Sequence, residues 1–197
     1  MSIAPAFGGP HAKKRKKSRA GGDRWRTPPA LVASCAARWG AIDMDLAAEP
    51  GASVAPRWWG PGGECEEAFS PRLFDCNGGW SAFYAGTKPS VCWCNPPFTK
   101  VAEFTALCAK LAAAGSTVIQ VAKVVPEVRW WDLIWSCASQ VWVPDRRIAF
   151  IHPETGRRVS GASHAHALVV WGPRLASERP AWRRCQLGPG QGVQSWG

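Results

Sequence analysis

Apolar residues recur at helical spacing in three stretches of the chain. Residues 29–39 and 101–114 carry apolar side chains every three or four positions, which predicts amphipathic helices. Residues 128–137 show a third, shorter pattern of this kind. Two of the helices end at a glycine, Gly40 and Gly115, the residue type that most readily terminates a helix.

Short apolar runs between these helices predict strands. The expected strands are residues 41–48, 91–94, 117–122, 140–143, 147–151 and 167–171. We expect the last two to form a final antiparallel pair. Alternation of strands and helices predicts an α/β fold: a mainly parallel sheet with helices on both faces and an antiparallel C-terminal edge.

Composition divides the chain of 197 residues into three parts. Residues 1–22 are rich in Gly, Ala, Pro and Lys/Arg and predict a basic disordered arm. Residues 23–173 contain all the predicted elements and form the expected domain. Residues 174–197 are rich in Gly, Pro and Arg and predict a flexible C-terminal tail. Within the domain, residues 49–79 predict a long loop, and loops of that length are commonly functional or mobile.

The tetrad Asn95, Pro96, Pro97 and Phe98 directly follows the predicted strand 91–94. Two prolines cannot continue a strand, so they fix a rigid turn at the strand's carboxyl end, where open α/β sheets bind ligands. The amide oxygen of Asn95 and a proline carbonyl could accept both N–H groups of an adenine amine and make its nitrogen more nucleophilic. Phe98 could stack on the base. The tetrad alone is equally consistent with a proline turn in which Asn95 bonds its own backbone.

Positive charge predicts a polyanionic partner. The formal charge is +10, from 24 Lys and Arg against 14 Asp and Glu. Six basic residues concentrate in the arm, and the remainder of the chain is still positive. We expect the arm to bind phosphates without sequence preference through Lys13, Lys14, Arg15, Lys16, Lys17 and Arg19.

The eight cysteines are expected to be free thiols in a reducing, cytoplasmic compartment. The start of the chain lacks the apolar core of a signal peptide, and no run has the length of a membrane helix. Cys92 and Cys94 with His164 and His166 do not show a usual zinc spacing, so no metal site is expected.

Asp43 and Asp45 lie at or near the end of the predicted strand that begins at Ala41. Acidic residues at a strand's carboxyl end often hold a nucleotide ribose or an amino group. A half-buried strand with solvated carboxylates explains the same pattern, and no glycine-rich phosphate loop follows.

In order and spacing, these features resemble the phage DNA N-6-adenine methyltransferase family, the small Dam-like enzymes of phages and prophages. The resemblance covers residues 23–173. It rests on Asp23, Trp25, Thr27-Pro28-Pro29, Asp43-x-Asp45-Leu-Ala47-Ala48, Pro56-Arg57-Trp58-Trp59, Asp75, Trp80, Trp93 to Phe98, Val118 to Ala122, Trp130-Trp131, Arg147-Ile148-x-Phe150 and Ala167 to Val170.

The resemblance implies a class I methyltransferase-like fold and transfer of a methyl group from S-adenosylmethionine to the exocyclic amine of adenine in double-stranded DNA. It places catalysis on Asn95, Pro96, Pro97 and Phe98. It places the cofactor on Trp25, Thr27, Pro28, Asp45, Ala47 and Asp75. The sequence departs from the family at Phe98, where tyrosine is commoner, and at His166, where a small polar residue is commoner.

Other functions share parts of this pattern. Cytosine N-4 methylation uses similar chemistry, although serine is commoner at the position of Asn95. Methylation of RNA adenine or of a protein glutamine also uses an Asn-Pro-Pro-aromatic tetrad. A non-catalytic phage DNA-binding protein could use the basic arm and exposed tryptophans. We expect a monomeric enzyme without a membrane partner, in the host cytoplasm if a phage encodes it.

Overall fold

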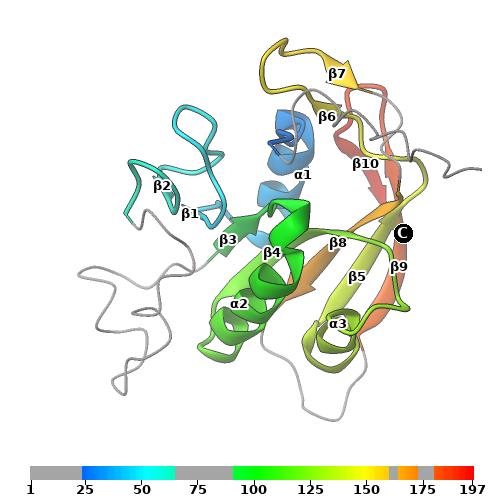
Figure 1. Ribbon diagram of the computed structural model, residues 1–197. Coiled ribbons are helices and arrows are strands. Elements are labelled where there is room, and N and C mark those ends of the chain that lie inside the picture. The colour runs from blue at the N-terminus through cyan, green and yellow to red at the C-terminus, as the bar shows by residue number, and fades with distance from the viewer. Residues whose placement is uncertain (1–23, 65–90, 160–163, 173–179) are drawn as a thin grey trace, which may run out of the picture.

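Figure 1 shows the computed structural model, which describes residues 24–64, 91–159, 164–172 and 180–197. An eight-stranded sheet runs through this part of the chain in the order β10-β9-β5-β8-β4-β3-β1-β2. Its strands are β1 Met44–Asp45, β2 Arg57–Trp58, β3 Val91–Cys94, β4 Thr117–Lys123, β5 Gln140–Pro144, β8 His166–Trp171, β9 Ala181–Leu187 and β10 Val193–Trp196. A separate hairpin pairs β6 Phe150–Ile151 with β7 Arg158–Val159 and projects beyond the end of the large sheet (Figure 1).

The sheet is mixed, with four parallel and three antiparallel pairings between neighbouring strands. Strands β2, β1, β3 and β4 pair in parallel, as do β5 and β9. Strand β8 runs antiparallel to both neighbours, β4 and β5. The carboxyl ends of β1, β3 and β4 therefore meet the start of β8 at one edge of the sheet, which positions the site described below.

Three α-helices cover the two faces of the sheet in the described residues. Helix α1 spans Pro29–Trp39, with a proline in its first turn, and it ends at Gly40, which adopts φ 107°. Helix α2, Val101–Ala113, follows a 3-10 turn at Phe98–Lys100, and α3 spans Trp131–Cys137. Helix α1 lies on one face of the sheet and α2 and α3 lie on the other (Figure 1).

Alternation along the central strands divides the core into two layers. On β4, Val118 and Ala122 pack towards α2 and α3, whereas Ile119 and Val121 pack towards α1. Gln120 is fully buried on the same strand. Its side-chain amide still has hydrogen-bond partners, because it donates to the Thr105 hydroxyl (2.9 Å) and accepts from the Trp171 indole (3.1 Å). Such paired polar groups fix one register without leaving an unsatisfied buried atom.

The predicted pairing of residues 147–151 with 167–171 is wrong. Strand β8 lies between β4 and β5, and all six of its residues are buried, as an interior strand requires. The segment before it forms only the short strand β6, whose partner is β7.

The prediction of a flexible C-terminal tail is also wrong for residues 181–196. These residues form β9 and β10 at the edge of the sheet. This antiparallel edge is built from a different part of the chain than the sequence pattern indicated. Strand β10 is further fixed to α1 because the Val193 N–H donates to the Ser34 hydroxyl at 2.8 Å. The basic arm and residues 65–79 of the predicted loop 49–79 lie outside the described residues. None of the described helices has the length and apolar character needed to cross a membrane.

Candidate active site

The tetrad begins where β3 ends, at the carboxyl edge of the sheet. Pro97 has φ −52° and ψ 127°, an extended backbone that leads into the 3-10 turn starting at Phe98. The Pro97 carbonyl accepts the Lys100 N–H at 2.8 Å. The Pro96 carbonyl accepts no hydrogen bond from the described backbone, so it is the proline acceptor that remains for a ligand.

The side-chain amide of Asn95 is oriented by the backbone of a segment 70 residues earlier. Its Nδ2 donates to the Trp25 carbonyl at 2.8 Å. Its Oδ1 is buried and accepts no hydrogen bond from the residues that the structure describes. Because burial of an unpaired acceptor is costly, this oxygen is a candidate ligand-binding atom.

The segment that holds Asn95 is itself held by the β6–β7 hairpin. Arg26 and Ile151 exchange two backbone hydrogen bonds, of 3.0 and 2.8 Å. The Trp25 ring meets the His152 ring edge-on, with centroids 5.3 Å apart. The Thr27 hydroxyl, in a residue that is 6% exposed, is a second buried polar atom without a partner in the described chain.

Asp45 ends β1 beside the tetrad and is 4% exposed. Its two carboxylate oxygens accept the backbone N–H groups of Ala47 and Val54, each at 3.1 Å. These bonds favour the charged form, but burial outweighs them and raises the pKa of Asp45 to about 6. Each oxygen retains a lone pair, so the carboxylate can still accept a hydrogen bond from a ligand.

These groups surround one cavity of about 210 Å³. Its lining includes six residues that the sequence assigned to the site: Trp25, Thr27, Asp45, Ala47, Asn95 and Pro97. Pro28 does not line it, because it is buried at the N-terminal cap of α1. Asp75 and the basic residues 13–19 lie outside the described residues.

Sequence reasoning missed several residues that line this cavity. They are Arg24, Arg26, Ala48, Glu49, Ala52, Val54 and Trp93. Arg24 and Glu49 form an ion pair across it. Only the position of Trp93, two residues before Asn95 on an alternating strand, carried a signal in the sequence.

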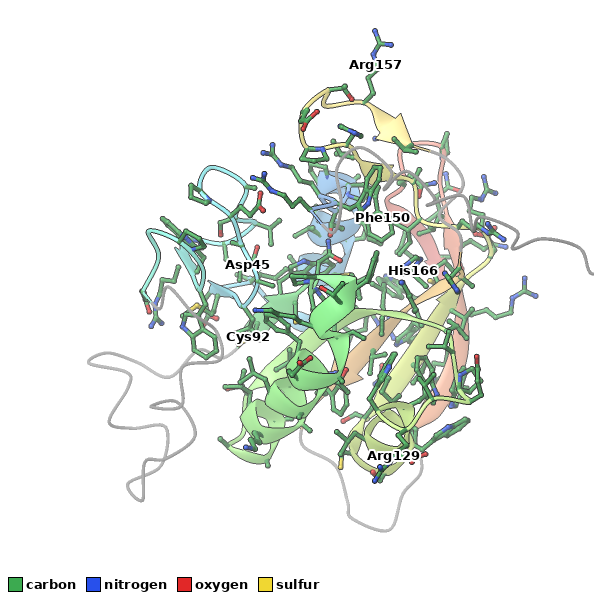
Figure 2. The ribbon with its side chains drawn as sticks, viewed as in Figure 1. Asp45, Cys92, Arg129, Phe150, Arg157 and His166 are labelled. Carbon is green, nitrogen blue, oxygen red and sulfur yellow. The ribbon has the colours of Figure 1, made fainter. Side chains whose placement is uncertain are left out.

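Phe98 lies on the other side of the tetrad and does not line the cavity. Its ring contacts those of His166 and Phe150, with centroids 5.2 and 6.2 Å away. In Figure 2 Phe150 and His166 lie next to each other, and Asp45 lies apart from them across the centre of the molecule. The tetrad thus lies between the cavity and an aromatic cluster.

The neighbouring cysteines are unsuited to nucleophilic catalysis. Cys94 is completely buried, and burial raises the pKa of its thiol well above the usual value. A protonated thiol is a poor nucleophile. In the described ranges, no three His, Cys, Asp or Glu side chains form a group that could hold a metal ion.

The sequence profile of one family, described as DNA N-6-adenine-methyltransferase (Dam), matches residues 14–181. The chain belongs to the Dam family. The Dam match contains the tetrad, strand β1 with Asp45, and the segment around Trp25. It also begins inside the predicted basic arm and stops at the first residue of β9, so the edge pair β9–β10 lies almost wholly beyond it. No individual curated protein matches the chain.

Proposed function

We propose that this Dam-family protein transfers a methyl group from S-adenosylmethionine to the N6 amine of adenine in DNA. The observation that carries the proposal is the arrangement of the Asn95 amide. Its N–H₂ donates to the Trp25 carbonyl, and its buried Oδ1, at the wall of the cavity, accepts no hydrogen bond from any described residue.

The lining of the cavity supports S-adenosylmethionine as the cofactor. Asp45 offers an anionic acceptor for its hydroxyl or ammonium groups, and the Thr27 hydroxyl lacks a partner among the described residues. Trp25 and Trp93 supply aromatic surface for its adenine ring. When bound, the cofactor supplies an electrophilic methyl group on a positively charged sulfur.

The tetrad holds the amine that accepts the methyl group. Asn95 Oδ1 and the Pro96 carbonyl each accept one amine N–H, which draws the nitrogen towards a tetrahedral geometry and exposes its lone pair. Phe98 stacks on the base and fixes its plane. Positioning and hydrogen bonding supply the catalysis, and no covalent enzyme intermediate is required.

The fold supports the proposal at a coarser level. The parallel strands β2, β1, β3 and β4 are followed by the antiparallel β8, the pattern expected of a class I methyltransferase. The tetrad lies at the carboxyl end of a parallel strand, where such sheets bind ligands.

A direct assay tests this function. Purified protein should transfer labelled methyl groups from S-adenosylmethionine to unmethylated DNA, and digestion should yield N6-methyladenine. Sequencing of modified bases would then give the target site. Recovery of N4-methylcytosine instead would show that the enzyme methylates the exocyclic amine of cytosine. Absence of any transfer would refute the proposal.

The basic arm provides a further prediction. Replacing Lys13, Lys14, Arg15, Lys16, Lys17 and Arg19 with glutamine should weaken DNA binding and reduce the slope of log affinity against log salt. The reduction should reach up to about 5, because each phosphate that the protein neutralises adds about 0.9 to that slope. Titrations at several salt concentrations measure it. An unchanged slope would show that the arm does not contact phosphates. Cofactor affinity is the control and should not change.

A further inference from the structure

The aromatic cluster beside Phe98 contains a polar group that the proposed mechanism does not use. His166 opens β8 and pairs in register with Lys123, the last residue of β4. Its ring lies 5.2 Å from Phe98 at a 35° tilt, and 5.0 Å from Phe150, edge-on. The Lys123 ammonium lies 4.3 Å from the centroid of the Phe98 ring.

His166 is 3% exposed. Its ring interacts with the backbone of His164, but neither ring nitrogen makes a hydrogen bond of good geometry within residues 24–64, 91–159, 164–172 or 180–197. Burial, followed by the positive charge of Lys123, lowers the pKa of His166 to about 4. The imidazole is therefore neutral at pH 7 and presents one N–H donor and one acceptor. Leaving both so poorly satisfied in the interior is unfavourable, and a ligand that supplies a well-placed partner removes the cost.

We propose that His166 is a hydrogen-bonding residue of the target-base site, whose N–H donates to a ring nitrogen of the adenine that stacks on Phe98. This inference rests on the proposed function. The ring nitrogens N1 and N7 are acceptors that lie on either side of the amine, so a donor beside Phe98 can reach a ring nitrogen next to the amine that Asn95 holds. Phe98 itself contributes no polar atom, and His166 supplies one from the neighbouring strand.

The alternative role for His166 is purely structural, as a ring that packs Phe98 in place. His166→Phe separates the two roles, because it keeps an aromatic ring in the cluster and removes the hydrogen bond. We expect His166→Phe to lower kcat/KM on adenine by about 10-fold, the effect of removing one buried hydrogen bond. His164→Phe, at an exposed position two residues earlier, is the matched control and should retain wild-type kcat/KM.

Substrate analogues complete the test. DNA with 1-deaza-adenine or 7-deaza-adenine at the target lacks one ring acceptor. One of the two analogues should lower kcat/KM of the wild-type enzyme by about 10-fold. The same analogue should lower kcat/KM of His166→Phe by less than about 2-fold, because the analogue and the substitution remove the same hydrogen bond. Equal losses in both enzymes, or no loss with either analogue in the wild type, would overturn the inference.

The wild-type reaction on unmodified DNA separates this inference from the proposed function. If that reaction fails, the proposed function is wrong. If it succeeds and His166→Phe reacts as the wild type does, only the role of His166 is wrong. Even if His166→Phe does not fold, the absence of any loss with either analogue in the wild type would overturn the inference.

Discussion

Asn95→Ala is expected to reduce methyl transfer by about 10²- to 10³-fold, the usual effect of removing one preorganised polar group that stabilises a transition state. The variant removes the buried Oδ1 acceptor and leaves the amine nitrogen without its main orienting partner. Single-turnover assays with saturating cofactor measure the loss in the chemical step.

Cofactor binding in Asn95→Ala should change much less than the rate. The variant also loses the bond to the Trp25 carbonyl, but the hairpin still holds this segment through the paired backbone of Arg26 and Ile151. Titration calorimetry with S-adenosylmethionine should therefore give a dissociation constant within a few-fold of the wild type.

Asn95→Asp is the matched control, because it keeps an oxygen at Oδ1 while losing the donor to Trp25. It should be clearly more active than Asn95→Ala. Near wild-type transfer by Asn95→Ala would show that this side chain does not hold the reacting amine.

Local signals were sufficient for the elements that position the site. The helix at residues 29–39 was predicted at its observed bounds, because proline fixes its first turn and Gly40 can adopt the positive φ that ends it. The strand at residues 91–94 and its break at Pro96 follow from the same backbone chemistry. Neither feature depends on distant contacts.

Long-range pairing decided what the sequence could not show. β8 is apolar on both faces, which is typical of an interior strand. Its own residues, however, do not indicate that β4 and β5 are its neighbours. β9 exposes its first four residues and buries only Cys185 and Leu187, a pattern too weak to predict a strand. Its pairing with β5 determines its structure, as tertiary context often does for strands.

The same limit applies to the site. Asp45 and Asn95 were recognisable as residues at the ends of predicted strands. The contact between Asn95 and the carbonyl of Trp25 joins segments 70 residues apart and has no signature in either. In the sequence, His166 was visible as a departure from the family and as a rejected zinc ligand, and its contact with Phe98 required the structure.

Asp45→Ala is expected to weaken S-adenosylmethionine binding by about 100-fold, since hydrogen bonds to a charged group contribute about 1.5–3 kcal/mol each. The variant removes the anionic acceptor. It also frees the backbone of Ala47 and Val54, two residues that line the cavity. Calorimetric titration measures the affinity, and circular dichroism at the same temperature checks that the variant is folded.

Glu49→Gln is the matched control for charge in the cavity. Glu49 also lines it, but its side chain is 32% exposed and paired with Arg24. An exposed ion pair of this kind contributes little, so affinity should change less than about 3-fold, a difference under about 1 kcal/mol. If Glu49→Gln weakened binding as much as Asp45→Ala, the assignment of Asp45 as the principal acceptor would be wrong.

Ionisation of Asp45 should make two quantities change in opposite directions as pH rises: the stability of the free protein should fall, and its affinity for the cofactor should rise. Its pKa is raised to about 6, so the free fold prefers the protonated form, and this group's contribution to the free energy of unfolding falls as pH rises from its usual pKa near 3.8 to about 6. The cofactor requires the carboxylate, so its affinity should rise about 10-fold per pH unit below 6 and level off above it. Titrations from pH 5 to 8 measure this trend. In Asp45→Asn the affinity should be weak and flat over the same range, whereas a wild-type affinity independent of pH would exclude Asp45 as the group that accepts the cofactor's hydrogen bonds.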